Sequence, residues 1–123
     1  MKLIYLKGLT TEQLIEEFAC LARRMGSAVL DSETRLFNRL FSKMQAIDRE
    51  LRSRGREARI MLVPLLEDED RFVRYYAAKY LLGLVPDRAR RVIEEIAKFK
   101  YDALCGDAGM CLYALDAGIF KPD

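Results

Sequence analysis

The chain has 123 residues, a length that suits one domain able to bury a core without disulfide staples. Hydrophobic residues make up 51% and charged residues 33%, which is typical of a globular protein and argues against intrinsic disorder. The net charge of +2 is too balanced to indicate a dedicated nucleic-acid or membrane-surface protein, and the absence of histidine excludes mechanisms that need an imidazole.

The first predicted helix follows a short N-terminal arm, residues 1–9, in which residues 3–6 are the only strand-like stretch. Thr10 and Gln13 have the spacing of a capping box, so the helix is expected to begin there. Apolar residues then recur at helical spacing as far as Gly26, which has the position of a helix-terminating glycine. We therefore expect an amphipathic helix that ends at Gly26.

A long second helix is predicted next, with Asp31 as its N-cap and Gly55 at its end. The third helix is predicted over residues 57–66 and contains Pro64. Because proline lacks an amide hydrogen and clashes with the preceding turn, we expect it to kink or shorten that helix.

Residues 67–70 form an acidic turn, Glu-Asp-Glu-Asp, which supplies N-capping carboxylates to the next helix. That fourth helix is predicted over residues 71–84, and a fifth follows over residues 88–98 after a proline break. In the fifth, Glu94 and Lys98 have the favourable i,i+4 spacing for an ion pair.

The last helix is predicted after a looser link over residues 99–106. Asp107 is its expected N-cap and Gly118 its expected C-terminal glycine. Gly106 and Gly109 open this helix without the lysine or hydroxyl of a phosphate-binding loop, so we assign this start to an N-cap aspartate plus a glycine that allows tight helix packing. Six helices without alternating strands predict an all-α fold.

Residues 62–81 resemble one HEAT repeat: an apolar helix, an acidic turn and a second helix with paired alanines. The paired alanines would let a neighbouring helix approach closely. Pro64 lies a few residues later than the usual proline of the repeat, and a weaker second unit is indicated by two Pro-Asp pairs 36 residues apart. The positions that match the repeat are Asp68, Val73, Arg74, Ala77, Ala78 and Leu81.

With residues 44–55 and 106–110, this repeat resembles a bacterial family of small HEAT-like domains of unknown function. The resemblance covers residues 14–118. It implies a HEAT/armadillo-like α-α superhelix of about six helices, forming a single domain over residues 1–123. It carries no known activity and therefore no catalytic or binding residues.

The cysteines and the N-terminal stretch indicate the compartment. The apolar run at the N-terminus is too short for a secretory signal, and no stretch approaches the roughly 18 apolar residues of a membrane span. We expect a cytoplasmic protein, no membrane partner and three free thiols, Cys20, Cys105 and Cys111. Because their spacing matches neither a redox nor a zinc motif, no metal or cofactor is expected.

One candidate site lies on the predicted helix 71–84. In helical-repeat proteins the second helix of a pair commonly lines the concave binding face, and Arg and Tyr often supply interface hot spots. The alternative is a solvated face on which Arg74 bridges Asp70. The residues expected opposite the buried stripe are Arg71, Arg74, Tyr75, Ala78 and Lys79, of which Arg71, Arg74, Tyr75 and Lys79 are the predicted partner-binding set.

A second candidate is an arginine-rich segment that could contact a phosphate backbone. Asp48, Glu50 and Glu57 are interleaved with its arginines and could neutralise them, and no aromatic residue is available there for base stacking. Asp48 is expected to pair with Arg52. The segment contains Arg49, Arg52, Arg54, Arg56 and Arg59.

Catalysis is not expected, because the serines have no histidine to activate them and neighbouring carboxylates on a helix diverge by about 100°. The sequence therefore predicts a non-enzymatic, HEAT-like interaction domain that binds a compact protein partner, or a second copy, on its concave face. The alternative function is nucleic-acid binding through the arginine-rich segment.

Overall fold

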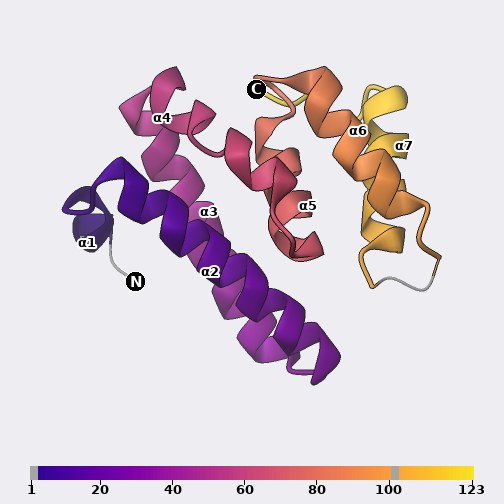
Figure 1. Cartoon of the computed structure of the whole chain (residues 1–123), viewed down its shortest axis with the longest axis horizontal. Helices are drawn as coiled ribbons and strands as arrows, with labels where there is room; N and C mark the ends of the chain where they lie inside the picture. The colour runs from indigo at the N-terminus through magenta and orange to yellow at the C-terminus, as the bar shows by residue number, and fades with distance from the viewer. Residues whose placement is uncertain (1–2, 101–102) are drawn as a thin grey trace. The chain divides into compact units, whose positions relative to one another are not determined.

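A computed structural model describes residues 3–100 and 103–123, and within these residues every regular element is helical. The chain divides into two units, residues 1–64 and 65–123. The expected all-α class is confirmed, and residues 3–6, the stretch with strand-like character, lie in a short helix. Figure 1 shows the elements, which are α1 (Leu3–Lys7), α2 (Thr11–Leu30), α3 (Thr34–Arg54), α4 (Arg56–Ile60), the 3-10 helix η1 (Val63–Glu67), α5 (Arg71–Leu81), α6 (Pro86–Ala97) and α7 (Cys105–Asp116).

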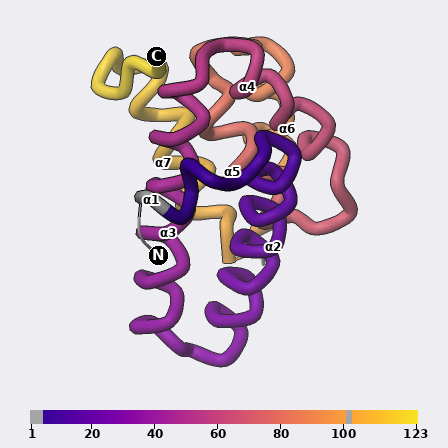
Figure 2. The backbone as a smooth tube through the Cα atoms, turned by 90° about the vertical axis from the view of Figure 1, so that its left-hand side faces the viewer, coloured from indigo at the N-terminus to yellow at the C-terminus, as the bar shows by residue number. Residues whose placement is uncertain are grey.

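The first unit is built around a hairpin of α2 and α3, which lie side by side in Figures 1 and 2. The predicted capping box is present: the Thr10 amide donates to Gln13 Oε1 over 2.8 Å, and the Gln13 amide donates to Thr10 Oγ1 over 3.1 Å. The helix continues through Gly26, so its predicted end there is wrong. Ala28 is 2% exposed, so the buried face continues past Gly26 and the helix with it.

Asp31 closes α2 instead of opening the next helix, which corrects its predicted role as an N-cap. Its amide donates to the carbonyl of Ser27, and Ser32 then adopts a left-handed conformation with φ of 56°. The chain turns there and α3 starts at Thr34. The N-cap position is occupied by Glu33, whose side chain forms no capping bond.

The core of the first unit consists of apolar side chains that face one another across the hairpin. They are fully buried or nearly so, and each contributes roughly 1.5–3 kcal/mol through removal of its surface from water. Most of them repeat at intervals of three or four residues along each helix, as the sequence pattern predicted. They are Leu14, Phe18, Leu21 and Met25 of α2, and Leu40, Met44, Ile47 and Leu51 of α3.

The proline effect expected in the third predicted helix is confirmed. The α-helix α4 ends at Ile60, and Pro64 lies in the 3-10 helix η1 that follows. Gly55 separates α3 from α4 with φ of 106°, a conformation that residues with a side chain rarely adopt.

The second unit begins with the acidic turn, which caps α5 as predicted. The carboxylate of Asp70 accepts the amides of Phe72 and Val73 over 2.8 and 3.2 Å, and Asp68 accepts the amide of Asp70 over 2.9 Å. Next in the chain, Pro86 occupies the first turn of α6, where its missing amide hydrogen costs nothing.

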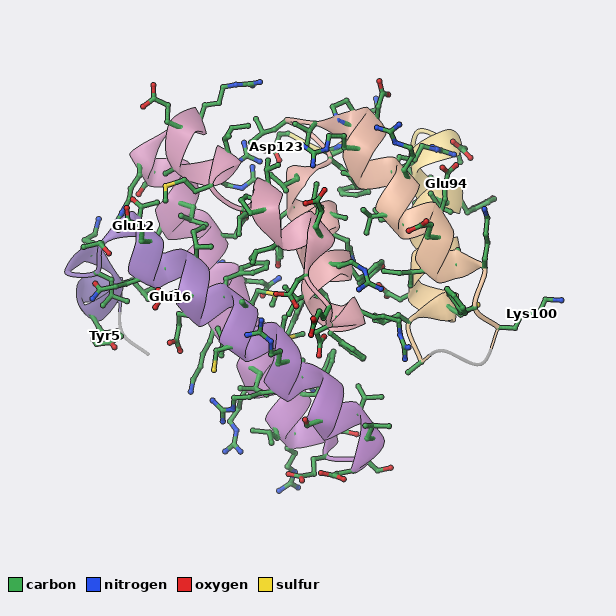
Figure 3. All side chains as sticks on the ribbon, in the orientation of Figure 1. Tyr5, Glu12, Glu16, Glu94, Lys100 and Asp123 are labelled. Carbon is green, nitrogen blue, oxygen red and sulfur yellow. The ribbon has the colours of Figure 1, made fainter. Side chains whose placement is uncertain are left out.

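Helices α6 and α7 pack against each other as antiparallel neighbours. Near one end Cys105 Sγ lies 3.3 Å from the carbonyl oxygen of Ala97, and near the other Arg90 contacts Asp116 over 2.9 Å. Glu94, labelled on α6 in Figure 3, accepts from Arg90 over 3.2 Å instead of forming the predicted pair with Lys98.

The prediction for the start of α7 is wrong, and the prediction for its end is confirmed. The helix starts at Cys105, so Asp107 lies within its first turn and is not the N-cap. At the other end Gly118 has φ of 73° and its amide donates to the carbonyl of Leu115, which is the predicted glycine termination. Part of the looser link expected over residues 99–106 lies outside the described residues.

Candidate functional site

The predicted partner-binding residues on α5 do not form one exposed surface. Six of the eleven residues of α5 are buried, so the helix is covered on more than one side. The side chains of Tyr75 and Ala78 are fully buried, and the prediction that they face solvent opposite Val73 is wrong. Arg71 is exposed, and the Lys79 side chain keeps 31% of its surface accessible.

Arg74 forms hydrogen bonds with the acidic turn that precedes its own helix. Its guanidinium donates to the carbonyl oxygens of Asp68 and Glu69 over 2.7 and 3.0 Å. The expected local bridge to the Asp70 carboxylate is replaced by these bonds, because that carboxylate already accepts two amides at the start of α5. Arg74 therefore holds the acidic turn against α5.

Tyr75 instead joins a polar cluster between α5 and α7. Its hydroxyl donates to Asp107 Oδ2, and Lys79 Nζ lies 3.5 Å from the same oxygen and 5.6 Å from the centre of the Tyr75 ring. Burial, and then the bond to Asp107, raise the pKa of Tyr75 well above its usual range. The hydroxyl thus stays protonated at neutral pH, and the cluster links two helices without providing a base.

Cys111 lies beside this cluster and is 7% exposed. Burial raises the pKa of its thiol, which lowers the fraction of reactive thiolate, so this cysteine is not activated as a nucleophile. In the described part of the chain, no three His, Cys, Asp or Glu side chains are grouped so that they could hold a metal ion.

Three of the five arginines in the arginine-rich segment are paired or buried in the structure. Arg52 donates to Asp48 over 2.8 Å, the pair that the sequence predicted, and Arg54 donates to Glu50 over 2.9 Å. Arg59 is buried at 9% exposure. The two exposed members of the segment are Arg49 and Arg56.

Arg54 has a particular role in the first unit. Besides pairing with Glu50, it donates to the carbonyl oxygen of Leu6 over 3.0 Å and to Thr11 Oγ1 over 3.3 Å. A single guanidinium therefore ties the end of α3 to the end of α1 and to the start of α2. This use leaves its donors directed into the protein instead of towards a phosphate backbone.

A surface that the sequence reasoning missed lies on α7. Met110 and Tyr113 are 68% and 63% exposed, and Gly106, Gly109 and Ala117 are exposed on the same side of the helix. These positions recur every three or four residues, so they form one stripe, which we call the α7 face. A side-chain carbon added at Gly106 or Gly109 would meet nothing within 4 Å, so the predicted close helix packing at these glycines is wrong within the chain.

One signal in the sequence could have revealed the α7 face. The stretch from Cys105 to Asp116 carries only two charged residues, Asp107 and Asp116, in twelve positions. A helix that is apolar on nearly all sides is expected to be covered on nearly all sides, yet Met110 and Tyr113 of α7 are 68% and 63% exposed.

These observations define a protein whose described residues form helices alone, with α2 packed on α3 in one unit and α6 packed antiparallel to α7 in the other. The chain belongs to the DUF2019 family, a domain of unknown function, whose family model matches residues 12–116. The protein RPA1889 from Rhodopseudomonas palustris CGA009, known from its crystal structure, is 40% identical, with a TM-score of 0.90 over 96% of this chain and 98% of that chain. No curated protein matches the chain.

The expected membership in a family of unknown function is therefore confirmed, with a bacterial protein as structural neighbour. Across the described residues, none of the helices is both long enough and apolar enough to cross a membrane.

Proposed function

We propose that this chain is a non-enzymatic protein-interaction domain that binds a protein partner through the α7 face. The observation that carries the proposal is the exposure of Met110 and Tyr113, at 68% and 63%, on a stripe without a charged side chain. Tyrosine and methionine are both enriched at protein interfaces, whereas a stripe of this kind has no function in water alone.

The proposal places the surface on a different helix from the one predicted by repeat geometry. Arg74 and Tyr75 were expected on a concave face, but both direct their polar groups to atoms of their own unit. The α7 face offers side chains whose apolar surface is still in contact with water. Covering one large aromatic or thioether side chain contributes roughly 1.5–3 kcal/mol to association.

HEAT-like pairing of the helices is part of the same proposal. It is supported by the repeat-like pattern of residues 62–81 and by the packing of α5 on α6 and of α6 on α7, each against its neighbour in the chain.

The proposal that the chain is not an enzyme rests on the side chains of the α5–α7 cluster, which do not favour acid–base or nucleophilic chemistry. The sequence has no histidine, and the tyrosine and cysteine of the α5–α7 cluster both have raised pKa values. The carboxylate of Asp107 is engaged by Tyr75 and Lys79. These groups stabilise the unit and leave no poised acid, base or nucleophile there.

The experiment is a tagged pull-down from native lysate with three forms of the chain: wild type, Tyr113→Glu and Tyr5→Glu. Tyr5 is a matched control because it is 57% exposed and lies on α1 in the other unit, where Figure 3 labels it. We expect a near-stoichiometric protein that Tyr113→Glu loses and Tyr5→Glu retains. Retention of every bound protein by Tyr113→Glu would contradict the proposal.

A further inference from the structure

We propose that the α7 face binds the α7 face of a second copy of this chain, with the two helices antiparallel. The inference rests on the proposed function and names the partner. An interface of this kind closes on itself through a two-fold axis, since each copy presents the same stripe to the other.

The spacing of residues along α7 fits this arrangement. Large and small side chains are placed symmetrically about a point between Cys111 and Leu112. In an antiparallel pair centred there, Met110 meets Tyr113 of the second copy and Tyr113 meets its Met110. By the same count Gly106 lies opposite Ala117 of the second copy, so the large side chains meet in the middle and small residues meet at the ends.

This pairing would account for the two glycines at the start of α7. Glycine is less favourable than alanine within a helix, and the space beside both glycines is empty within 4 Å in their own chain. Helix axes pack roughly 8–10 Å apart, and the shorter distances need small residues at the contact. Gly106 and Gly109 would allow the second helix to approach at the lower end of that range.

The charges around the stripe also permit a second copy. Asp107 and Asp116 flank the stripe, and each is matched within its own chain, by Lys79 at 3.5 Å and by Arg90 at 2.9 Å. The bond to Arg90 also lowers the pKa of Asp116, in keeping with an ion pair between the two side chains. By the same count Asp107 lies opposite Asp116 of the second copy, and the intrachain partners Lys79 and Arg90 offset the repulsion between these two carboxylates.

The available area sets the strength of the pairing. A helix of 12 residues is roughly 18 Å long, and a strip of that length falls short of the roughly 800 Å² per partner of a stable interface. Two further apolar side chains are exposed nearby in the chain: Ile119, at 73%, follows α7, and Phe99, at 62%, follows the end of α6 that Cys105 contacts. In an antiparallel pair the Phe99 end of one copy faces the Ile119 end of the other. We therefore expect a reversible dimer with Kd between about 10 μM and 1 mM.

Sedimentation velocity from about 5 μM to about 1 mM tests the inference on the full chain. We expect the wild-type mass to rise from one chain towards two, and Tyr113→Glu to raise the Kd at least about tenfold by placing two carboxylates near the two-fold axis. Tyr5→Glu should match the wild type. A wild type that stays monomeric throughout, or a dimer unchanged by Tyr113→Glu, overturns the inference.

Disulfide trapping tests the orientation without relying on Tyr113. In a background of Cys20→Ser and Cys105→Ser, chains with Gly106→Cys are mixed with chains with Ala117→Cys and oxidised. Antiparallel pairing predicts that the mixed disulfide forms faster than either homodimeric disulfide, and the reverse order overturns it. If the wild type is monomeric while Tyr113→Glu still loses its lysate partner, the proposed function stands and the second copy is excluded as that partner.

Discussion

Replacing Arg54 by alanine should destabilise the first unit more than replacing any exposed arginine of the same segment. Arg54 joins the end of α3 to α1 and α2 through bonds of 2.9, 3.0 and 3.3 Å to Glu50, Leu6 and Thr11. The substitution removes all three contacts at once. It also leaves Glu50, whose side chain is 7% exposed, without its strongest partner.

The magnitude follows from the burial of Glu50. Removing one member of a buried ion pair costs roughly 3–5 kcal/mol, because the remaining charge is left without compensation. Here the cost is smaller, since Arg54 itself is 20% exposed and Lys7 Nζ lies 4.0 Å from the other carboxylate oxygen of Glu50. We expect Arg54→Ala to lower the free energy of unfolding by about 2–3 kcal/mol.

Urea denaturation followed by circular dichroism measures this difference, and hydrogen exchange localises it to α1 and the adjoining turns. Arg49→Ala is the matched control, because Arg49 is exposed and its loss should change the free energy of unfolding by less than about 0.5 kcal/mol. Adding Glu50→Gln to Arg54→Ala should recover at least about 1 kcal/mol by removing the uncompensated charge. Equal stabilities of Arg54→Ala and Arg49→Ala would refute the reasoning.

Three further predictions concern other sites. Burial raises the pKa of Tyr75 and Tyr76, so as the pH rises the unfolded chain loses these protons before the folded chain does. The free energy of unfolding should therefore fall above pH 10, by up to about 1.4 kcal/mol per pH unit for each tyrosine. When stability is measured against alkaline pH, the fall should be shallower in Tyr75→Phe. With a thiol reagent at pH 8, exposed Cys20 should react at once and buried Cys111 only on unfolding, which a time course shows. Gly83→Ala would place a carbon 2.3 Å from the carbonyl carbon of the last residue, so the C-terminal segment should be displaced and exchange its amides faster.

The elements that sequence reasoning predicted correctly are those determined by a few neighbouring residues. Thr10 and Gln13 cap each other across three positions, and Asp70 caps α5 through the two amides that follow it. Pro64 acts through its own missing donor, and Gly118 through a backbone conformation. Each signal is complete within one turn of helix, and in these four cases the tertiary structure agrees with it.

The errors arise where a distant part of the chain decides the outcome. Gly26 is followed by Ala28, which packs in the hairpin core and extends the helix beyond the expected stop. Asp107 has the character of an N-cap, but the Tyr75 hydroxyl, 32 residues away, takes its carboxylate. Burial of Tyr75 could not be read from the periodicity of α5, because that helix is covered on two sides and not one.

The same contrast explains why the α7 face is more informative than the charged residues singled out in the sequence. Arg52, Arg54 and Arg74 are all candidate ligand-binding residues by sequence, although Arg52 is also expected to pair with Asp48, and each donates to an oxygen of its own unit. A charge on a helical surface can always find such a partner nearby, so its presence says little about function. An exposed apolar side chain has no such local partner, which is why the proposed interaction surface rests on Met110 and Tyr113, beside helical glycines, and not on the arginines.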